Sequence, residues 1–262
     1  MAEVELATAA WLPLTGRPSA IAQVFCMPHA GGGTTSFQGW EAYLPAQIAL
    51  VPVRAPGREL RFTEPPFAHI TPLVQALQAA IVSALDRPYV LLGHSLGALI
   101  AFELARTLRR SDAPSPLGLI VSGYPAPQLP RERLAAHRLP DAALKHVLCE
   151  LGGVADEVLA NDELLSLFLP LLRADLAVDE SYEYESQTPL EVPIVAFAGE
   201  DDRVAHPADV ACWREQTSSA FRMHLLAGGH FSCYEEAPRF LRLVEMHVSH
   251  WLRTEGGNAG VA

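Results

Sequence analysis

The chain has 262 residues, half of them hydrophobic, and its formal net charge is −11 at pH 7. This length suits one large domain with a substantial core, and the acidic balance argues against nucleic acid or an anionic membrane as a partner. The chain starts without a signal-peptide pattern, and no apolar run reaches the ~18 residues of a membrane span, so we expect a cytoplasmic protein with reduced cysteines.

Short apolar segments typical of buried strands alternate with segments of helical periodicity. Strands are expected at 22–28, 50–55, 89–93, 117–123, 193–199 and 222–227. Helices are expected at 70–85, at 96–108 and at 238–252. This alternation predicts an α/β fold with a mostly parallel central sheet and helices on both faces.

One section interrupts the alternation. Residues 127–185 begin with a proline-rich stretch and continue with helical character only. Because open α/β sheets bind ligands at the carboxyl edge of their strands, we expect a helical lid over that edge. The alternative is a subdomain that only adds stability. The expected core is one discontinuous domain, 20–126 and 186–253, with terminal extensions at 1–19 and 254–262 and a disordered tail.

A serine stands on the turn between the third expected strand and the helix that follows it. Residues 93–97, GHSLG, form a G-x-S-x-G, whose glycines permit the strained turn that exposes the hydroxyl of Ser95. The following helix directs free N–H groups at the place where negative charge would develop. This pattern predicts a nucleophile elbow and an α/β-hydrolase fold. His94 is expected to pack or to form hydrogen bonds rather than to act as the base.

A serine nucleophile needs a base, and the base needs an acceptor that orients it. In α/β-hydrolases the order along the chain is serine, acid, histidine. His230 follows the last expected strand on a glycine-rich loop, and the strand before it ends in a Gly-Glu-Asp-Asp. The acid is Asp202 or Asp201; Asp202 is preferred because it stands three residues after the strand-closing glycine. No HExxH or Cys/His cluster indicates a metal, and we expect no cofactor.

The oxyanion of a tetrahedral intermediate requires two N–H donors aimed at one point. The residue after the nucleophile, Leu96, supplies one of them. The second is expected from the glycine-rich loop 27–33 after the first strand, where Ala30 is the preferred donor.

Five motifs together are particular to one family. They are PHAGGG at 28–33, RAPGRELRFTEPP at 54–66, GHSLGALIAFELA at 93–105, LGG at 151–153 with LPLLRAD at 169–175, and GGHF at 228–231. With them the chain resembles a type II thioesterase, the stand-alone editing hydrolase of polyketide synthases and nonribosomal peptide synthetases. The resemblance implies the triad Ser95–Asp202–His230, with Ala30 and Leu96 as oxyanion donors and a lid over the pocket.

The implied activity is hydrolysis of acyl thioesters on the phosphopantetheine arm of acyl or peptidyl carrier proteins, which removes stalled or aberrant groups. We expect weak, transient docking of the carrier, with Arg54, Arg58 and Arg61 as candidates for the docking surface unless they brace their own loop through Glu59 or Glu64. The alternatives are a small-molecule carboxylesterase or lipase, release of medium-chain fatty acids from a fatty acid synthase, and a hydrolase-fold binding protein without turnover.

Overall fold

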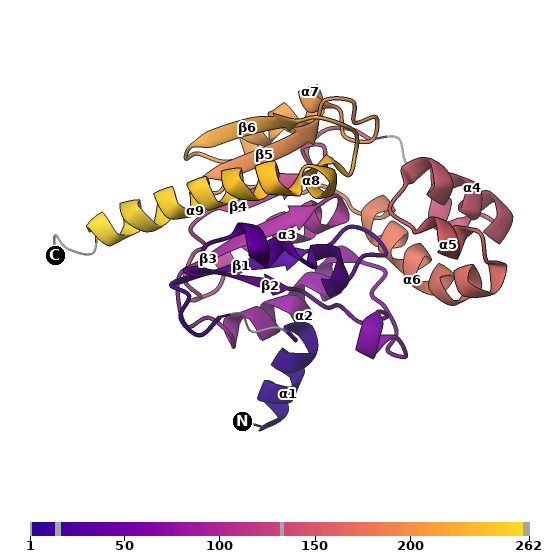
Figure 1. The fold of residues 1–262 in the computed structure, drawn as a ribbon, viewed down its shortest axis with the longest axis horizontal. Coiled ribbons are helices and arrows are strands. Elements are labelled where there is room, and N and C mark those ends of the chain that lie inside the picture. The colour runs from indigo at the N-terminus through magenta and orange to yellow at the C-terminus, as the bar shows by residue number, and fades with distance from the viewer. Residues whose placement is uncertain (1, 14–16, 132–133, 259–262) are drawn as a thin grey trace.

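One parallel sheet organises the molecule (Figure 1). The computed structural model describes residues 2–13, 17–131 and 134–258, and within them six parallel strands pair in the order β2-β1-β3-β4-β5-β6. The strands are β1 (Ala22–Met27), β2 (Ile48–Pro52), β3 (Tyr89–His94), β4 (Leu119–Ser122), β5 (Ile194–Gly199) and β6 (Phe221–Leu226). Each predicted strand overlaps one of these, and the predicted α/β fold is confirmed.

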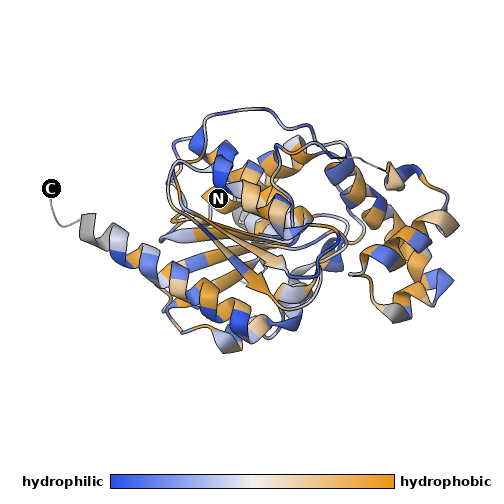
Figure 2. Cartoon of the chain, turned by 90° about the horizontal axis from the view of Figure 1, so that it is seen from above, coloured by the Kyte–Doolittle hydropathy of each residue, from blue (hydrophilic) through white to orange (hydrophobic). Residues whose placement is uncertain are grey.

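Helices cover both faces of the sheet, which lies between two helical layers in Figure 2. One layer contains α2 (Ile70–Val82) and α3 (Leu96–Arg109), and the other contains α8 (Ser232–Glu235) and α9 (Ala237–Asn258). Successive side chains of a strand point to opposite faces, so Leu91 packs into the core cluster with α2 and α3, whereas Leu92 packs into the cluster with α9. Every residue of β1 to β5 is therefore buried.

Both chain ends contribute more structure than the sequence predicted. Helix α1 (Ala2–Trp11) precedes the sheet, and Trp11 and Leu12 at its end are buried in the core. Helix α9 continues to Asn258, so residues 254–258 of the expected disordered tail are helical, while 259–262 lie outside the described residues. The buried inner face of α9 holds the helix against the sheet, and extending an existing helix costs little per residue.

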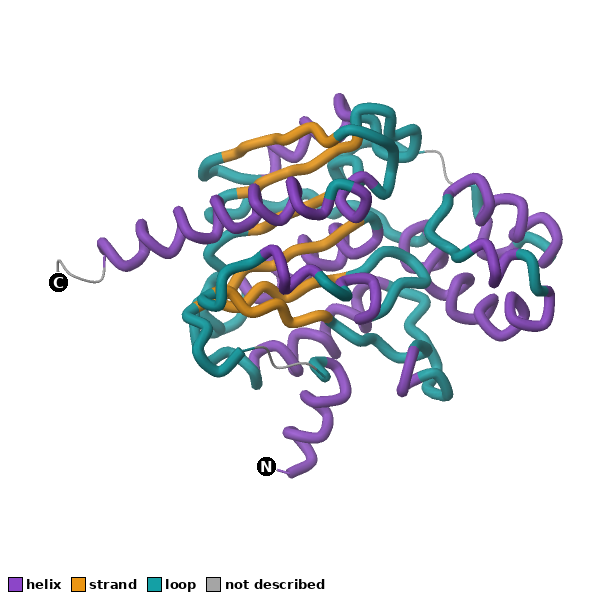
Figure 3. Tube along the Cα trace, in the orientation of Figure 1, coloured by secondary structure: helices purple, strands orange, loops and turns teal. Residues whose placement is uncertain are grey.

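The insertion at 127–185 forms a helical body beside the sheet, seen at the right of Figures 1 and 3. Its helices are α4 (Asp141–Leu151), α5 (Asp156–Leu159) and α6 (Asp162–Glu180). Asn161 caps α6, because its side chain accepts hydrogen bonds from the first-turn N–H groups. The insertion buries an apolar cluster of its own between α4 and α6. Among the helices of the described segments, none combines the length and the apolarity of a membrane span.

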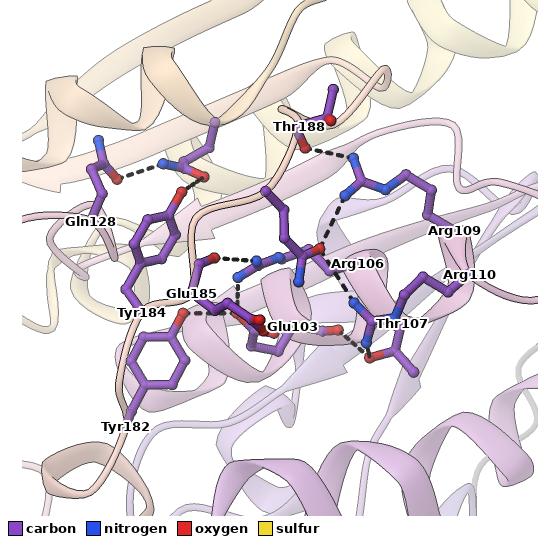
Figure 4. Close-up of polar contacts among 12 residues, drawn as sticks. Glu103, Arg106, Thr107, Arg109, Arg110, Gln128, Tyr182, Tyr184, Glu185 and Thr188 are labelled. Carbon is purple, nitrogen blue, oxygen red and sulfur yellow. Dashed lines mark hydrogen bonds and ion pairs between the residues drawn. The ribbon is translucent and has the colours of Figure 1, made fainter.

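The segment that returns from the lid to β5 is fastened to α3 (Figure 4). Tyr182 Oη donates to Glu103 Oε1 (2.8 Å), which also accepts from Arg106 Nη1 (2.6 Å). Arg106 Nη2 donates to the backbone carbonyl of Glu185, and Arg109 donates to the backbone a few residues further on. Because α3 starts directly after the predicted nucleophile, these contacts tie the end of the lid to the helix of the elbow.

Candidate active site

The turn between β3 and α3 holds Ser95 in a strained conformation. Its φ is 54° and its ψ is −126°, a region that non-glycine residues rarely occupy. A Cβ atom at Gly93 would lie 2.0 Å from the carbonyl oxygen of Gly97, and one at Gly97 would lie 2.1 Å from that of Met27. Both positions therefore require glycine. The end of β3 packs directly on the first turn of α3, and this turn packs directly on the end of β1, so neither contact leaves space for a side chain.

Three side chains predicted from distant parts of the sequence lie in one hydrogen-bonded row. Ser95 Oγ is 3.0 Å from His230 Nε2, and His230 Nδ1 is 3.0 Å from Asp202 Oδ2. Asp201, the alternative acid, is exposed to solvent, and the structure places Asp202 against the imidazole. The row has the order nucleophile, base and orienting carboxylate that acyl transfer requires.

The surroundings of Asp202 favour its ionised form. Burial alone would raise the pKa of this carboxyl, but the hydrogen bond from His230 and those from two backbone N–H groups lower it below its usual value. Asp202 Oδ1 accepts from the N–H groups of Val204 (2.8 Å) and Ala205 (2.9 Å). The carboxylate is thus fixed by backbone donors on one side and aimed at the imidazole on the other.

The two expected oxyanion donors line the same cavity as Ser95. Leu96 is the first residue of α3, where the helix offers its N–H no acceptor. Among the described residues, no acceptor contacts the N–H of Ala30, although the next N–H, of Gly31, donates to Asp175 Oδ2 (2.7 Å). Gly31 has φ of 75°, which turns successive N–H groups of the loop in different directions.

A buried ion pair holds that loop. Arg58 donates to Asp175 Oδ1 (2.9 Å) and to the carbonyl of Gly32 (2.6 Å), and Asp175 belongs to lid helix α6. Arg58 is only 8% exposed, so its assignment to a carrier-docking surface is wrong. Arg61 pairs with Glu64 and braces its own loop, as the alternative interpretation had it. The one available signal for the structural role of Asp175, which was not predicted, is its position as a charged residue at the end of the apolar run LPLLRAD.

Replacing Asp175 with alanine is expected to destabilise the fold by about 3–5 kcal/mol, because Arg58 would remain buried without its counter-ion. The N–H of Gly31 would also lose its acceptor. Urea unfolding of both proteins measures the difference. The matched control is Asp141→Ala, which removes an exposed ion pair of the same lid with Arg173 and should change stability by less than about 1 kcal/mol. Equal effects of the two substitutions would contradict the structural role of Asp175.

Ser95 and His230 lie in the wall of a cavity of about 250 Å³ between the sheet edge and the lid. The lid contributes apolar side chains, among them Val147, Leu148, Leu151, Val154, Leu172 and Leu176. Such a mostly apolar cavity fits a hydrocarbon-rich substrate group. Within the residues described, no cluster of three or more His, Cys, Asp or Glu side chains is arranged to hold a metal ion.

Two further histidines, His94 and His29, lie near His230. His94 is buried, its Nδ1 lies 3.2 Å from Ser122 Oγ, and its ring centroid is 5.1 Å from that of His230. Burial lowers the pKa of His94 well below its usual value and lowers that of His29 to about 4. Both rings are therefore neutral at pH 7, and neither places a positive charge beside His230.

We expect stability to fall as the pH is lowered from about 6.5 towards 4. Burial also lowers the pKa of His247, to about 4, so His29, His94 and His247 take up protons in the unfolded chain before they do so in the folded one. Each such histidine removes up to about 1.4 kcal/mol per pH unit in this window. Urea unfolding at several pH values measures the slope, and His247→Gln should reduce it; an unchanged slope in the variant would exclude His247 as a contributor.

Comparison with known proteins shows the family of this chain. Residues 22–247 match the family described as the thioesterase domain. The chain belongs to the thioesterase family. The resemblance seen in the sequence motifs is thereby confirmed.

Individual thioesterases are similar over most of this chain. The gramicidin S biosynthesis protein GrsT of Aneurinibacillus migulanus is 40% identical over 81% of this chain and 83% of its own length. YbtT, a structure described as the type II thioesterase of the yersiniabactin NRPS/PKS biosynthetic pathway, is 37% identical, with a TM-score of 0.81 over 90% of this chain and 96% of its own. The medium-chain S-acyl fatty acid synthase thioesterase of Rattus norvegicus is 30% identical over 82% of each protein.

Proposed function

We propose that this thioesterase is a serine hydrolase that removes stalled or aberrant acyl groups from the phosphopantetheine arms of carrier proteins in nonribosomal peptide or polyketide biosynthesis. The observation that carries the proposal is the row Ser95–His230–Asp202, with 3.0 Å between successive partners, whose Ser95 and His230 line a lidded apolar cavity. Membership of the thioesterase family identifies a thioester as the bond that is hydrolysed. The similar proteins GrsT and YbtT belong to biosynthetic pathways of the proposed kind.

The residues have distinct roles in the proposed reaction. His230 takes the proton of Ser95 while the hydroxyl oxygen attacks the thioester carbonyl, and Asp202 stabilises the resulting imidazolium. The N–H groups of Ala30 and Leu96 stabilise the oxyanion. Collapse of this intermediate breaks the carbon–sulfur bond, and the imidazolium protonates the departing thiolate. A water molecule, activated by His230, then hydrolyses the acyl-Ser95 ester and releases the acid. The proposed reaction requires no cofactor.

The carrier protein is proposed as a weakly and transiently bound partner. An editing enzyme must sample many carriers without blocking a productive one, and the net charge of −11 gives no long-range attraction to an acidic partner. Recognition is then local, through the phosphopantetheine arm. Arg58 is buried in its ion pair with Asp175, and Arg61 pairs with Glu64, so neither is proposed for docking. Arg54 is partly exposed and donates to the backbone carbonyl of Ala10, and it stays a candidate for the docking surface.

The test compares one acyl group on three leaving groups: a carrier protein, a short free thiol and an alcohol. We expect the highest kcat/KM for the carrier-bound thioester and a carrier affinity in the micromolar range or weaker. Ser95→Ala serves as the blank for spontaneous hydrolysis. If the oxygen ester or the free thioester is hydrolysed better, a general esterase replaces the editing function.

The fatty acid synthase alternative is tested by alkyl chain length. The similarity to the rat enzyme keeps this activity as the second candidate. A kcat/KM that rises steeply from short to medium unbranched chains on the same carrier would favour it, whereas hydrolysis of short acyl groups with little dependence on length favours editing.

A further inference from the structure

The wall of the acyl cavity contains a polar cluster that the proposed mechanism does not use. Tyr124, Arg131 and Asp179 line the same cavity as Ser95 and His230. Tyr124 Oη donates to Asp179 Oδ1 (2.6 Å). Arg131 Nη1 donates both to Tyr124 Oη (2.6 Å) and to Asp179 Oδ1 (3.1 Å), and its guanidinium carbon lies 4.7 Å from the centroid of the Tyr124 ring. The three groups form a closed network in an otherwise mostly apolar wall.

This network is held rigidly relative to the catalytic row. The carbonyl of Tyr124 accepts a hydrogen bond from Trp213 Nε1 (2.7 Å), and Tyr124 is 3% exposed. The preceding residue, Gly123, lies so near the base that a Cβ atom there would be 3.4 Å from His230 Cε1. Asp179 lies on α6, the helix whose Asp175 is bonded to the oxyanion loop. A polar group in such a fixed setting can discriminate between substrates.

One carboxylate oxygen of Asp179 remains available. Both protein donors converge on Oδ1, and no described residue donates to Oδ2, which is not among the fully buried unpaired atoms. Burial raises the pKa of Tyr124 well above its usual value, so the phenol keeps its proton and continues to donate to Oδ1. Oδ2 is therefore a hydrogen-bond acceptor at the cavity wall.

We propose, on the basis of the proposed thioesterase function, that Asp179, oriented by Tyr124 and Arg131, selects acyl groups that carry a hydrogen-bond donor, a hydroxyl or a protonated amine, over pure hydrocarbon chains. A hydrocarbon chain in the cavity strips water from the carboxylate without replacing its hydrogen bonds. A hydroxyacyl or aminoacyl group replaces them, and the apolar lid side chains contact the rest of the chain.

The substitution Asp179→Asn replaces the free hydrogen-bond acceptor at the cavity wall with a donor, and it changes the shape of the side chain little. Because Tyr124 and Arg131 both donate to the Oδ1 position, the asparagine must place its carbonyl oxygen there and its NH₂ group where Oδ2 stood. The free position then donates instead of accepting. We expect the ratio of kcat/KM for a donor-bearing acyl group to that for its alkyl isostere to fall by about 10- to 100-fold.

The experiment measures hydrolysis of three thioesters of one short thiol: a hydroxyacyl group, an aminoacyl group and the alkyl acyl group of the same shape. The ratio between substrates within one protein sample does not depend on the fraction folded. Tyr124→Phe, which leaves Asp179 less well oriented, should lower the ratio by a smaller factor. Asp141→Asn, on the exposed side of the lid, should leave it unchanged.

A preference for either donor-bearing substrate that is lost in Asp179→Asn supports the inference. Hydrolysis of all three thioesters with equal kcat/KM, or a preference that persists in Asp179→Asn, overturns this inference alone. Failure of the wild-type protein to hydrolyse any thioester, free or carrier-bound, overturns the proposed function and this inference with it.

Discussion

Replacing Ser95 with alanine is expected to lower kcat by about 10⁶-fold while the protein remains folded. The alanine removes the atom that forms the acyl-enzyme bond, so only the oxyanion donors and substrate binding continue to contribute. Among the described residues, Ser95 Oγ is hydrogen-bonded only to His230, so we expect its loss to leave the turn between β3 and α3 unchanged. Single-turnover hydrolysis of an acyl thioester measures the loss, and thermal unfolding checks that the fold is retained.

A second measurement assigns the nucleophile directly. A fluorophosphonate reacts with an activated serine, and mass spectrometry should find the label on Ser95 of the wild type and none on the alanine variant. His230→Ala should also abolish labelling, because His230 is the side chain that hydrogen-bonds the Ser95 hydroxyl within the described residues. Labelling of a different serine, or normal turnover by Ser95→Ala, would contradict the proposed mechanism.

Replacing Asp202 with asparagine is expected to lower kcat on the order of 10³- to 10⁴-fold. The amide cannot accept the Nδ1 proton as the carboxylate does, so the imidazole is left in the wrong tautomer and its protonated form is not stabilised. The N–H groups of Val204 and Ala205 can still donate to the amide oxygen, and the loop should therefore keep its shape.

Asp201→Asn is the matched control, because it changes the adjacent carboxylate in the same way. Asp201 is exposed and its side chain is not hydrogen-bonded to His230, so the kcat of this variant should change by less than about 10-fold. The kcat values of both variants decide which aspartate orients His230, and circular dichroism spectra check that both variants are folded alike. A larger loss for Asp201→Asn than for Asp202→Asn would show that the acid is assigned to the wrong residue.

Local patterns were sufficient to predict the scaffold and most of the hydrogen-bonded row proposed as catalytic. Strands such as Tyr89–His94 are buried on both faces and therefore appear as continuous apolar runs, and GHSLG marks the sharp turn after one of them. Because the carboxyl ends of parallel strands meet at one edge of the sheet, residues that follow different strands, such as Ser95 and His230, are brought together by the topology alone.

The choice between Asp201 and Asp202 shows where local pattern stops being sufficient. Spacing from the strand-closing glycine favoured Asp202, but two adjacent carboxylates in a loop point in different directions that sequence does not specify. In the structure the N–H of Asp202 bonds back to the carbonyl of Gly199 (3.2 Å), and this turn aims the side chain inward. Because Asp202 is the residue hydrogen-bonded to His230, the geometry favours Asp202 over Asp201 as the acid.

The sequence by itself determined the strands, the helices beside them, the elbow and the order of the proposed catalytic residues, because each depends on short-range spacing or on the parallel topology. Only the tertiary structure decided how the lid meets the core. Arg58 bonds Asp175 across 117 positions, and Tyr124 bonds Asp179 across 55, so one face of α6 holds the oxyanion loop and the cavity wall together. Which face of a helix meets which loop depends on the packing of the whole domain. The local sequence around a charged residue in an apolar run does not identify the distant residue with which it pairs.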